Sequence, residues 1–133
     1  MKLEHIALSI SDSEEIKKFY HDILGMNQLR TFNLSKVLAN DIFGIDKEPS
    51  VYLLQKDELL VEIFVTTKQY KQGFKHICIL IKNREELIKK AAQNSYKCIH
   101  IKRKKSDLIF IKDKSGNIFE IKESNTEEHS FAQ

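Results

Sequence analysis

"HIALSISDSEEIKK" (residues 5–18) recurs in this 133-residue chain as "HICILIKNREELIKK" (residues 76–90). The two copies align at a constant offset of 71, which places Asp12 over Asn83. In each copy a short β-rich run leads to an Asp or Asn at a helix N-cap position, and glutamates follow in the first turn. The repeat therefore predicts a strand followed by a helix in each half of the chain.

A second pair of segments repeats further along the chain. "VYLLQKDELLVEIF" (51–64) aligns with "IFIKDKSGNIFEIK" (109–122) at an offset of 58, so Tyr52 lies over Phe110. Both aromatic residues are expected to pack in the core. Each segment predicts a β-hairpin, and the second hairpin has "DKSG" at its turn.

The two repeats together predict an α+β fold of two tandem βαβββ modules. We expect a curved mixed β-sheet cup with helices over about 13–24 and 83–95 on its outer face, and an unrelated α+β sandwich is the alternative. The first copy is 13 residues longer, within 33–49, where "SKVLANDIFG" predicts a short helix ended by Gly44. The expected boundaries are about 1–68 for module 1, about 72–123 for module 2, 1–125 for the single domain that contains both, and 126–133 for a polar C-terminal tail.

Composition limits the class of protein. Apolar residues make up 41% and charged residues 31% of the chain, with a net charge of +3, which is ordinary for a soluble globular protein. The basic run "KRKK" (102–105) lacks an aromatic platform and predicts a solvated strand end. Cys78 and Cys98 belong to no CxxC motif and are expected to be free thiols, with Cys78 buried and inert. The longest apolar runs are far too short to span a bilayer, and the N-terminus lacks the basic and apolar regions of a signal peptide. We therefore expect a cytoplasmic protein with neither a membrane nor a nucleic-acid partner.

Polar residues stand opposite the aliphatic rows of the predicted strands. Successive strand side chains point to opposite faces, so Ile6 and Leu8 share one face and His5 lies on the other. Equivalent positions of the repeats place four polar residues on one concave face: His5, Glu62, His76 and Glu120. Burial of two unpaired carboxylates is costly without a cation. Two neutral imidazoles and two carboxylates would neutralise a divalent ion and suit zinc, nickel, cobalt, manganese or ferrous iron.

These segments resemble the vicinal oxygen chelate superfamily, which includes glyoxalase I, methylmalonyl-CoA epimerase, extradiol dioxygenases, and fosfomycin and bleomycin resistance proteins. The resemblance covers residues 2–123 and rests on "HIALSISDSEEIKKFYHDILGM", "GFKHICILIKN" and "KDKSGNIFEIKE", which is similar to the family's D-x-x-G-x-x-x-E ending. It implies paired βαβββ modules around a metal, a small-molecule substrate and a homodimer, with each site built within one chain or across two. The metal ligands that it implies are His5, Glu62, His76 and Glu120.

The ligand set resembles that of bacterial glyoxalase I most closely. Glu62 departs from the pattern of epimerases, extradiol dioxygenases and glutathione-type fosfomycin enzymes. Where glyoxalase I has an Arg and an Asn placed for glutathione, this chain has Ser9 and Thr66. The resemblance therefore implies a glyoxalase-like metalloenzyme of lyase or isomerase type whose substrate is not assigned.

The reaction that the resemblance implies is metal-assisted proton transfer on a substrate with vicinal oxygens. Negative charge would develop on an enediolate oxygen and be stabilised by the ion. Glu120 or Glu62 would act as the catalytic base. Two alternatives remain open: a non-catalytic protein that binds an antibiotic or another small molecule, and an extradiol dioxygenase-like enzyme.

Overall fold

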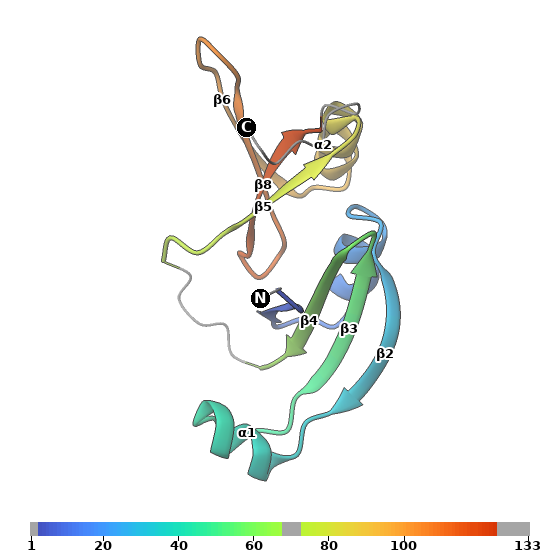
Figure 1. The fold of residues 1–133 in the computed structure, drawn as a ribbon, viewed down its shortest axis with the longest axis vertical. Helices are drawn as coiled ribbons and strands as arrows, with labels where there is room; N and C mark the ends of the chain where they lie inside the picture. The colour runs from blue at the N-terminus through green and yellow to red at the C-terminus, as the bar shows by residue number, and fades with distance from the viewer. Residues whose placement is uncertain (1–2, 68–72, 125–133) are drawn as a thin grey trace. The chain divides into compact units, whose positions relative to one another are not determined.

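The computed structural model describes residues 3–67 and 73–124, and the chain divides into two compact units, residues 1–71 and 72–133. Each unit contains one four-stranded mixed sheet and the helices that connect its strands (Figure 1). The predicted α+β fold of two βαβββ modules is confirmed. The tail predicted at 126–133 lies outside the described residues.

The first unit contains the longer copy of the repeat. Its elements are β1 (Ile6–Ile10), η1 (Ile16–His21), β2 (Asn27–Asn33), α1 (Lys36–Phe43), β3 (Ser50–Lys56) and β4 (Leu59–Val65). The strand order in the sheet is β1-β4-β3-β2. β1 runs parallel to β4, whereas β2 and β4 are each antiparallel to β3.

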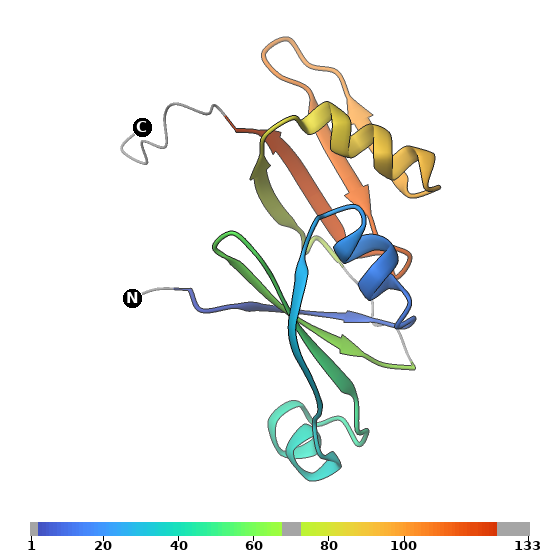
Figure 2. The same cartoon turned by 90° about the vertical axis from the view of Figure 1, so that its right-hand side faces the viewer.

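The second unit has the same topology without the extra helix. Its elements are β5 (Ile77–Ile81), α2 (Arg84–Gln93), β6 (Lys97–Ile101), β7 (Leu108–Lys112) and β8 (Ile118–Glu123). The strand order is β5-β8-β7-β6, with β5 parallel to β8. Figure 2 shows α2 beside this sheet, where it packs against β6 and β8. The sequence repeat is therefore a structural repeat.

Strand register determines which side chains share a face in each sheet. Ala7 of β1 lies opposite Glu62 of β4, and Cys78 of β5 lies opposite Glu120 of β8. The other face of each sheet carries aliphatic and aromatic side chains that are at most 1% exposed: Val61, Ile63, Phe119 and Ile121. The predicted alternation of polar and apolar positions is thus present in both sheets.

The alignment of the two hairpins is off by one residue in the third strand of each module. Glu62 pairs with Leu53 across β3, whereas Glu120 pairs with Phe110 across β7. The sequence alignment instead places Phe110 over Tyr52. The second hairpin has the longer turn, and a shift of one residue moves a strand side chain to the other face. Phe110 therefore lies on the same face as Glu120.

The helix predicted over 13–24 contains a π-helix, η1. The Asp22 N–H donates to the Lys17 carbonyl at 2.8 Å, and the Leu24 N–H donates to the Phe19 carbonyl at 3.0 Å. Both bonds span five residues, which defines a π-helical turn. The helical segment ends at Gly25, whose φ of 74° places it in the left-handed region that favours glycine.

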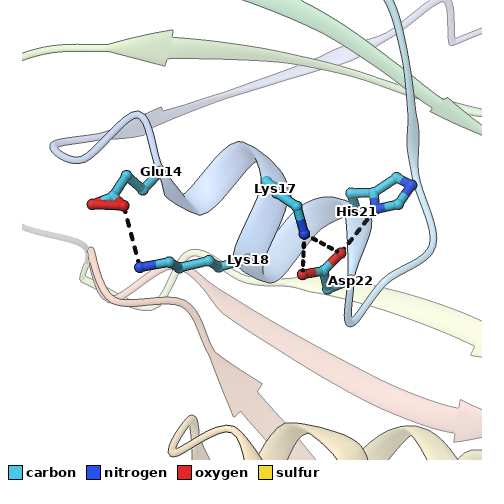
Figure 3. Close-up of polar contacts among 5 residues, drawn as sticks. All are labelled: Glu14, Lys17, Lys18, His21 and Asp22. Atoms are coloured by element: carbon cyan, nitrogen blue, oxygen red, sulfur yellow. Dashed lines mark hydrogen bonds and ion pairs between the residues drawn. The ribbon is translucent and has the colours of Figure 1, made fainter.

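Charged side chains pair along the exposed surface of η1 (Figure 3). Lys17 Nζ lies 3.0 Å from Asp22 Oδ2, and His21 Nδ1 lies 2.9 Å from Asp22 Oδ1. Lys18 and Glu14 form a further pair at 3.3 Å. The hydrogen bond from His21, and then that from Lys17, hold the pKa of Asp22 below its ordinary value.

The start of α2 differs from the prediction that Asn83 caps it. The φ of Asn83 is 62°, and its side chain donates to Glu86 Oε2 at 2.6 Å instead of capping the backbone. The carboxylate of Glu123, at the end of β8, accepts from the N–H groups of Asn83 and Arg84 at 2.9 Å each. A residue remote in sequence therefore supplies the cap, next to the positive end of the helix dipole.

The helix predicted within 33–49 is confirmed as α1. Ser35 Oγ accepts from the Leu38 N–H at 3.2 Å, and Gly44 ends the helix with a φ of 69°. In the part of the chain that the structure describes, no helix is both long enough and apolar enough to span a membrane.

Candidate metal centre

The first unit brings together one of the predicted histidines and one of the predicted glutamates. His5 directly precedes β1, and Glu62 lies in the neighbouring parallel strand β4. His5 Nε2 lies 3.2 Å from Glu62 Oε1. The side chain of Glu62 is 19% exposed and that of His5 is 40% exposed, so the carboxylate is the more shielded partner.

The second unit forms the equivalent pair from β5 and β8. His76 directly precedes β5, and its Nε2 lies 3.6 Å from Glu120 Oε1. The side chain of Glu120 is 14% exposed and that of His76 is 47% exposed. The ring of Phe110 stands edge-on to the His76 imidazole, with 6.4 Å between centroids. Each unit therefore presents one imidazole beside one mostly shielded carboxylate.

The hydrogen bond on the other ring nitrogen determines which atom of His76 can bind a metal. His76 Nδ1 lies 3.0 Å from the carbonyl oxygen of Phe74. A carbonyl only accepts, so Nδ1 carries the proton and donates it. In the neutral ring Nε2 then has a lone pair, which faces a carboxylate oxygen that is also an acceptor. Two acceptors face each other favourably only with a cation or a proton between them, and histidine ligands of metals commonly donate their second nitrogen to such a carbonyl.

The "DKSG" turn positions the strand that carries Glu120. Asp113 is 5% exposed, and its Oδ1 accepts from the N–H groups of Ser115 at 3.0 Å and Asn117 at 2.8 Å. Its Oδ2 accepts from Asn117 Nδ2 at 2.7 Å. Gly116 has a φ of 89°, a conformation that favours glycine. The D-x-x-G part of the motif thus builds the turn, and the final Glu is part of the candidate site.

Cys78 is exposed, contrary to the expectation that it is buried. It lies opposite Glu120 in the register of β5 and β8. Partial desolvation, followed by the negative charge of Glu120, raises the pKa of the Cys78 thiol. A raised pKa lowers the thiolate fraction, so the expectation of low reactivity still agrees with its surroundings.

Two features of the second unit were not predicted from the sequence. The Phe74 carbonyl that orients His76 is a backbone atom, and no residue type predicts it. Phe110 is misplaced by the hairpin alignment, and only the longer turn after β7 could have indicated its true face. The structure also pairs His100 with Asp107, which joins β6 to the residue before β7.

The four predicted residues lie as two pairs, one in each unit. Within residues 3–67 and 73–124, no group of three or more His, Cys, Asp and Glu side chains is placed to hold a metal ion. The donor set of imidazole nitrogens and carboxylate oxygens fits a borderline or hard divalent ion.

The model of the Glyoxalase/Bleomycin resistance protein/Dioxygenase superfamily matches residues 2–121. A search of the curated proteins found no match. Structures with the same fold include a glyoxalase family protein from Enterococcus faecalis, with 18% identity, a TM-score of 0.70 and coverage of 90% of this chain and 95% of that one.

Two other solved structures share the fold at low sequence identity. A glyoxalase family protein from Bacillus cereus has a TM-score of 0.75 at 11% identity and covers 92% of this chain and 93% of its own. A mutant of the fosfomycin resistance protein FosX from Listeria monocytogenes, complexed with Mn(II) and 1S,2S-dihydroxypropylphosphonic acid, has a TM-score of 0.73 at 14% identity and covers 95% and 94%. From the match over residues 2–121, the chain belongs to the Glyoxalase/Bleomycin resistance protein/Dioxygenase superfamily.

Proposed function

We propose that this protein is a glyoxalase-like metalloenzyme that catalyses proton transfer, of isomerase or lyase type, on a small substrate with vicinal oxygens. The observation that carries the proposal is the repeated histidine–glutamate pair. His5 and Glu62 in one unit, and His76 and Glu120 in the other, occupy equivalent places beside parallel strands. Two shielded carboxylates that each face an imidazole nitrogen suit a shared cation better than solvent.

The proposed metal ligands are the nitrogens of His5 and His76 and the carboxylate oxygens of Glu62 and Glu120. Zinc, nickel, cobalt, manganese and ferrous iron all accept this set. The FosX complex, which has the same fold, contains Mn(II), and this supports a divalent ion as the proposed metal. A bound ion would act as a Lewis acid that polarises a substrate oxygen.

The two glutamates are the proposed proton carriers. Each lies on a central strand of its sheet and has a mostly covered side chain, so its position is well defined. Glu120 is the first candidate for the general base, because Phe110 adds an apolar neighbour on its face. Glu62 is the second candidate, since the repeat gives it the same strand position. The carboxylate would take the proton from the carbon next to the carbonyl and return it to the neighbouring carbon.

Deuterium exchange tests this proposal directly. The metal-loaded protein is incubated in deuterated water with hemithioacetals of several thiols and with α-hydroxy and α-keto thioesters. We expect deuterium at the carbon beside the carbonyl, with exchange lost in Glu120→Gln and retained in Glu62→Gln. Exchange that survives in Glu120→Gln but is lost in Glu62→Gln would reverse the two roles. The absence of exchange from every substrate would contradict the proposed reaction.

The same material separates the alternatives. Oxygen consumption with catechols under ferrous iron would favour a dioxygenase-like enzyme. Thermal stabilisation by fosfomycin or bleomycin that does not depend on metal would favour a resistance-type binding protein. We further propose a cytoplasmic homodimer, for which analytical ultracentrifugation gives the oligomeric state. Mixing of metal-deficient His5→Ala and His76→Ala chains would restore metal binding only if sites form across two chains.

A further inference from the structure

The first unit contains a cavity of about 340 Å³ that the proposed metal site does not use. Half of the residues that line it belong to the 33–49 insertion, and the others belong to β1, β4 and the residues just after β4. The second unit has no counterpart of the insertion in the sequence repeat. A cavity of this size is at the lower end of the range for small-molecule sites.

The floor of the cavity is the face of the sheet that carries Glu62. Ala7 and Ser9 line it from β1, and their register partners in β4 are Glu62 and Phe64. Side chains that are paired in register share a face. Thr66 continues the same row beyond Phe64. The cavity therefore lies next to Glu62 along this face, and a ligand bound beside Glu62 could extend into it.

The walls of the cavity are mostly apolar. Ala39 and Phe43 of α1 line it together with Ile45. The ring of Phe43 stands edge-on to that of Phe64, with 5.6 Å between centroids. Such an aromatic pair favours a flat or compact apolar group. Lys47 is the one ammonium group among the lining residues, and it is offset by the neighbouring Glu48.

We infer that this cavity binds an apolar, preferably aromatic, substituent of the substrate whose vicinal oxygens lie beside Glu62. The inference rests on the proposed function for the oxygen-bearing end of the substrate. The cavity itself is independent of any metal. α1 is then a specificity-determining element, because it supplies the wall that the shorter repeat lacks.

Two probes separate the cavity from the metal. Benzyl alcohol carries the apolar ring without vicinal oxygens, and its binding is followed by amide NMR shifts without added metal. 3-Phenyllactate and lactate share a hydroxy-acid group and differ in the ring, and their affinities are measured by calorimetry on zinc-loaded protein. We expect benzyl alcohol to shift the amide signals of Ala39, Phe43 and Phe64. We also expect 3-phenyllactate to bind about tenfold more tightly than lactate, which corresponds to about 1.4 kcal/mol.

Matched variants of α1 make the result specific. Ala39→Leu fills the cavity from a buried position and keeps a good helix former, so it should abolish the benzyl alcohol shifts. Phe43→Ala removes one wall from a half-exposed position and should reduce the preference for 3-phenyllactate about threefold or more. Ile42→Ala, at the adjacent exposed position that does not line the cavity, should behave like wild type.

The outcomes distinguish the two proposals. Benzyl alcohol shifts that are absent, or that persist in Ala39→Leu, would overturn the cavity inference, as would equal affinities for 3-phenyllactate and lactate. Lactate binding that is unaffected by removal of zinc would overturn the metal-based function. In that case, ring-dependent binding that is lost in Ala39→Leu would still support the cavity.

Discussion

Replacement of Asp113 by alanine should destabilise the second unit strongly, because this buried carboxylate holds the turn before β8. It accepts three hydrogen bonds, from the N–H groups of Ser115 and Asn117 and from Asn117 Nδ2, at 2.7–3.0 Å. Asn117 is 3% exposed, so it would lose two of these bonds in a buried position. A hydrogen bond to a charged group contributes about 1.5–3 kcal/mol, but bonds that share one acceptor do not add fully. We expect Asp113→Ala to lower the free energy of unfolding by about 3–4 kcal/mol.

Urea unfolding followed by far-UV circular dichroism measures this loss. Asp113→Asn keeps an acceptor for the two backbone N–H groups but sets its own NH2 against Asn117 Nδ2, so it should cost about 1–2 kcal/mol. Glu58→Ala, in the exposed turn of the first hairpin, is the control and should change stability by less than about 0.5 kcal/mol. If Asp113→Ala cost no more than Glu58→Ala, the carboxylate would not organise the turn and the reasoning would be refuted.

Two further predictions concern the helices. Glu123→Ala removes the carboxylate that accepts from the N–H groups of Asn83 and Arg84, so it should lower the free energy of unfolding by about 1 kcal/mol. Glu123→Gln should have an intermediate stability. Equal stability of wild type and both variants in urea would show that the cap is supplied elsewhere. His21 and Lys17 lower the folded-state pKa of Asp22, so its stabilising effect is present above the unfolded pKa of about 3.9 and is lost as the pH falls through the folded value. Asp22→Asn should therefore be less stable than wild type at neutral pH and equally stable in strong acid. Thermal unfolding across this pH range measures the difference in stability. A difference that does not change with pH would contradict a stabilising role of the ionised Asp22.

The sequence predicts the fold well because the repeat and the strand alternation are both local patterns. "HIALSI" and "HICILI" each place one histidine just before an aliphatic strand, and the register of β1 with β4 and of β5 with β8 then brings a glutamate to each. The helix boundaries were predicted less accurately. A short π-helical turn is defined by its backbone hydrogen bonds, which span five residues instead of four, and no residue type marks that change, so η1 is not distinguishable from sequence.

The features that could not be predicted from the sequence depend on contacts between residues that are distant along the chain. Glu123 caps α2 from a strand 39 residues away from Arg84, and the longer second hairpin turns Phe110 toward Glu120. The Phe74 carbonyl that orients His76 is a backbone group, which carries no residue signal. The cavity is lined by residues of the 33–49 insertion together with residues of β1 and β4, which are distant in sequence. Sequence spacing identifies candidate ligands, but the atoms that orient them come from tertiary structure.

Metal binding by wild type and by ligand variants tests the central claim most directly. Protein purified without chelators or a metal-affinity tag is dialysed against zinc or manganese, and its metal content and affinity are measured by elemental analysis and calorimetry. We predict about one divalent ion per chain in wild type, with loss of the ion in the combined His5→Ala and Glu120→Ala variant, which takes one ligand from each pair. His100→Ala, which removes a histidine paired with Asp107 instead, should bind metal like wild type. One tightly bound ion per chain in the combined variant, or none in wild type, would contradict the assignment of His5, Glu62, His76 and Glu120 as a metal site.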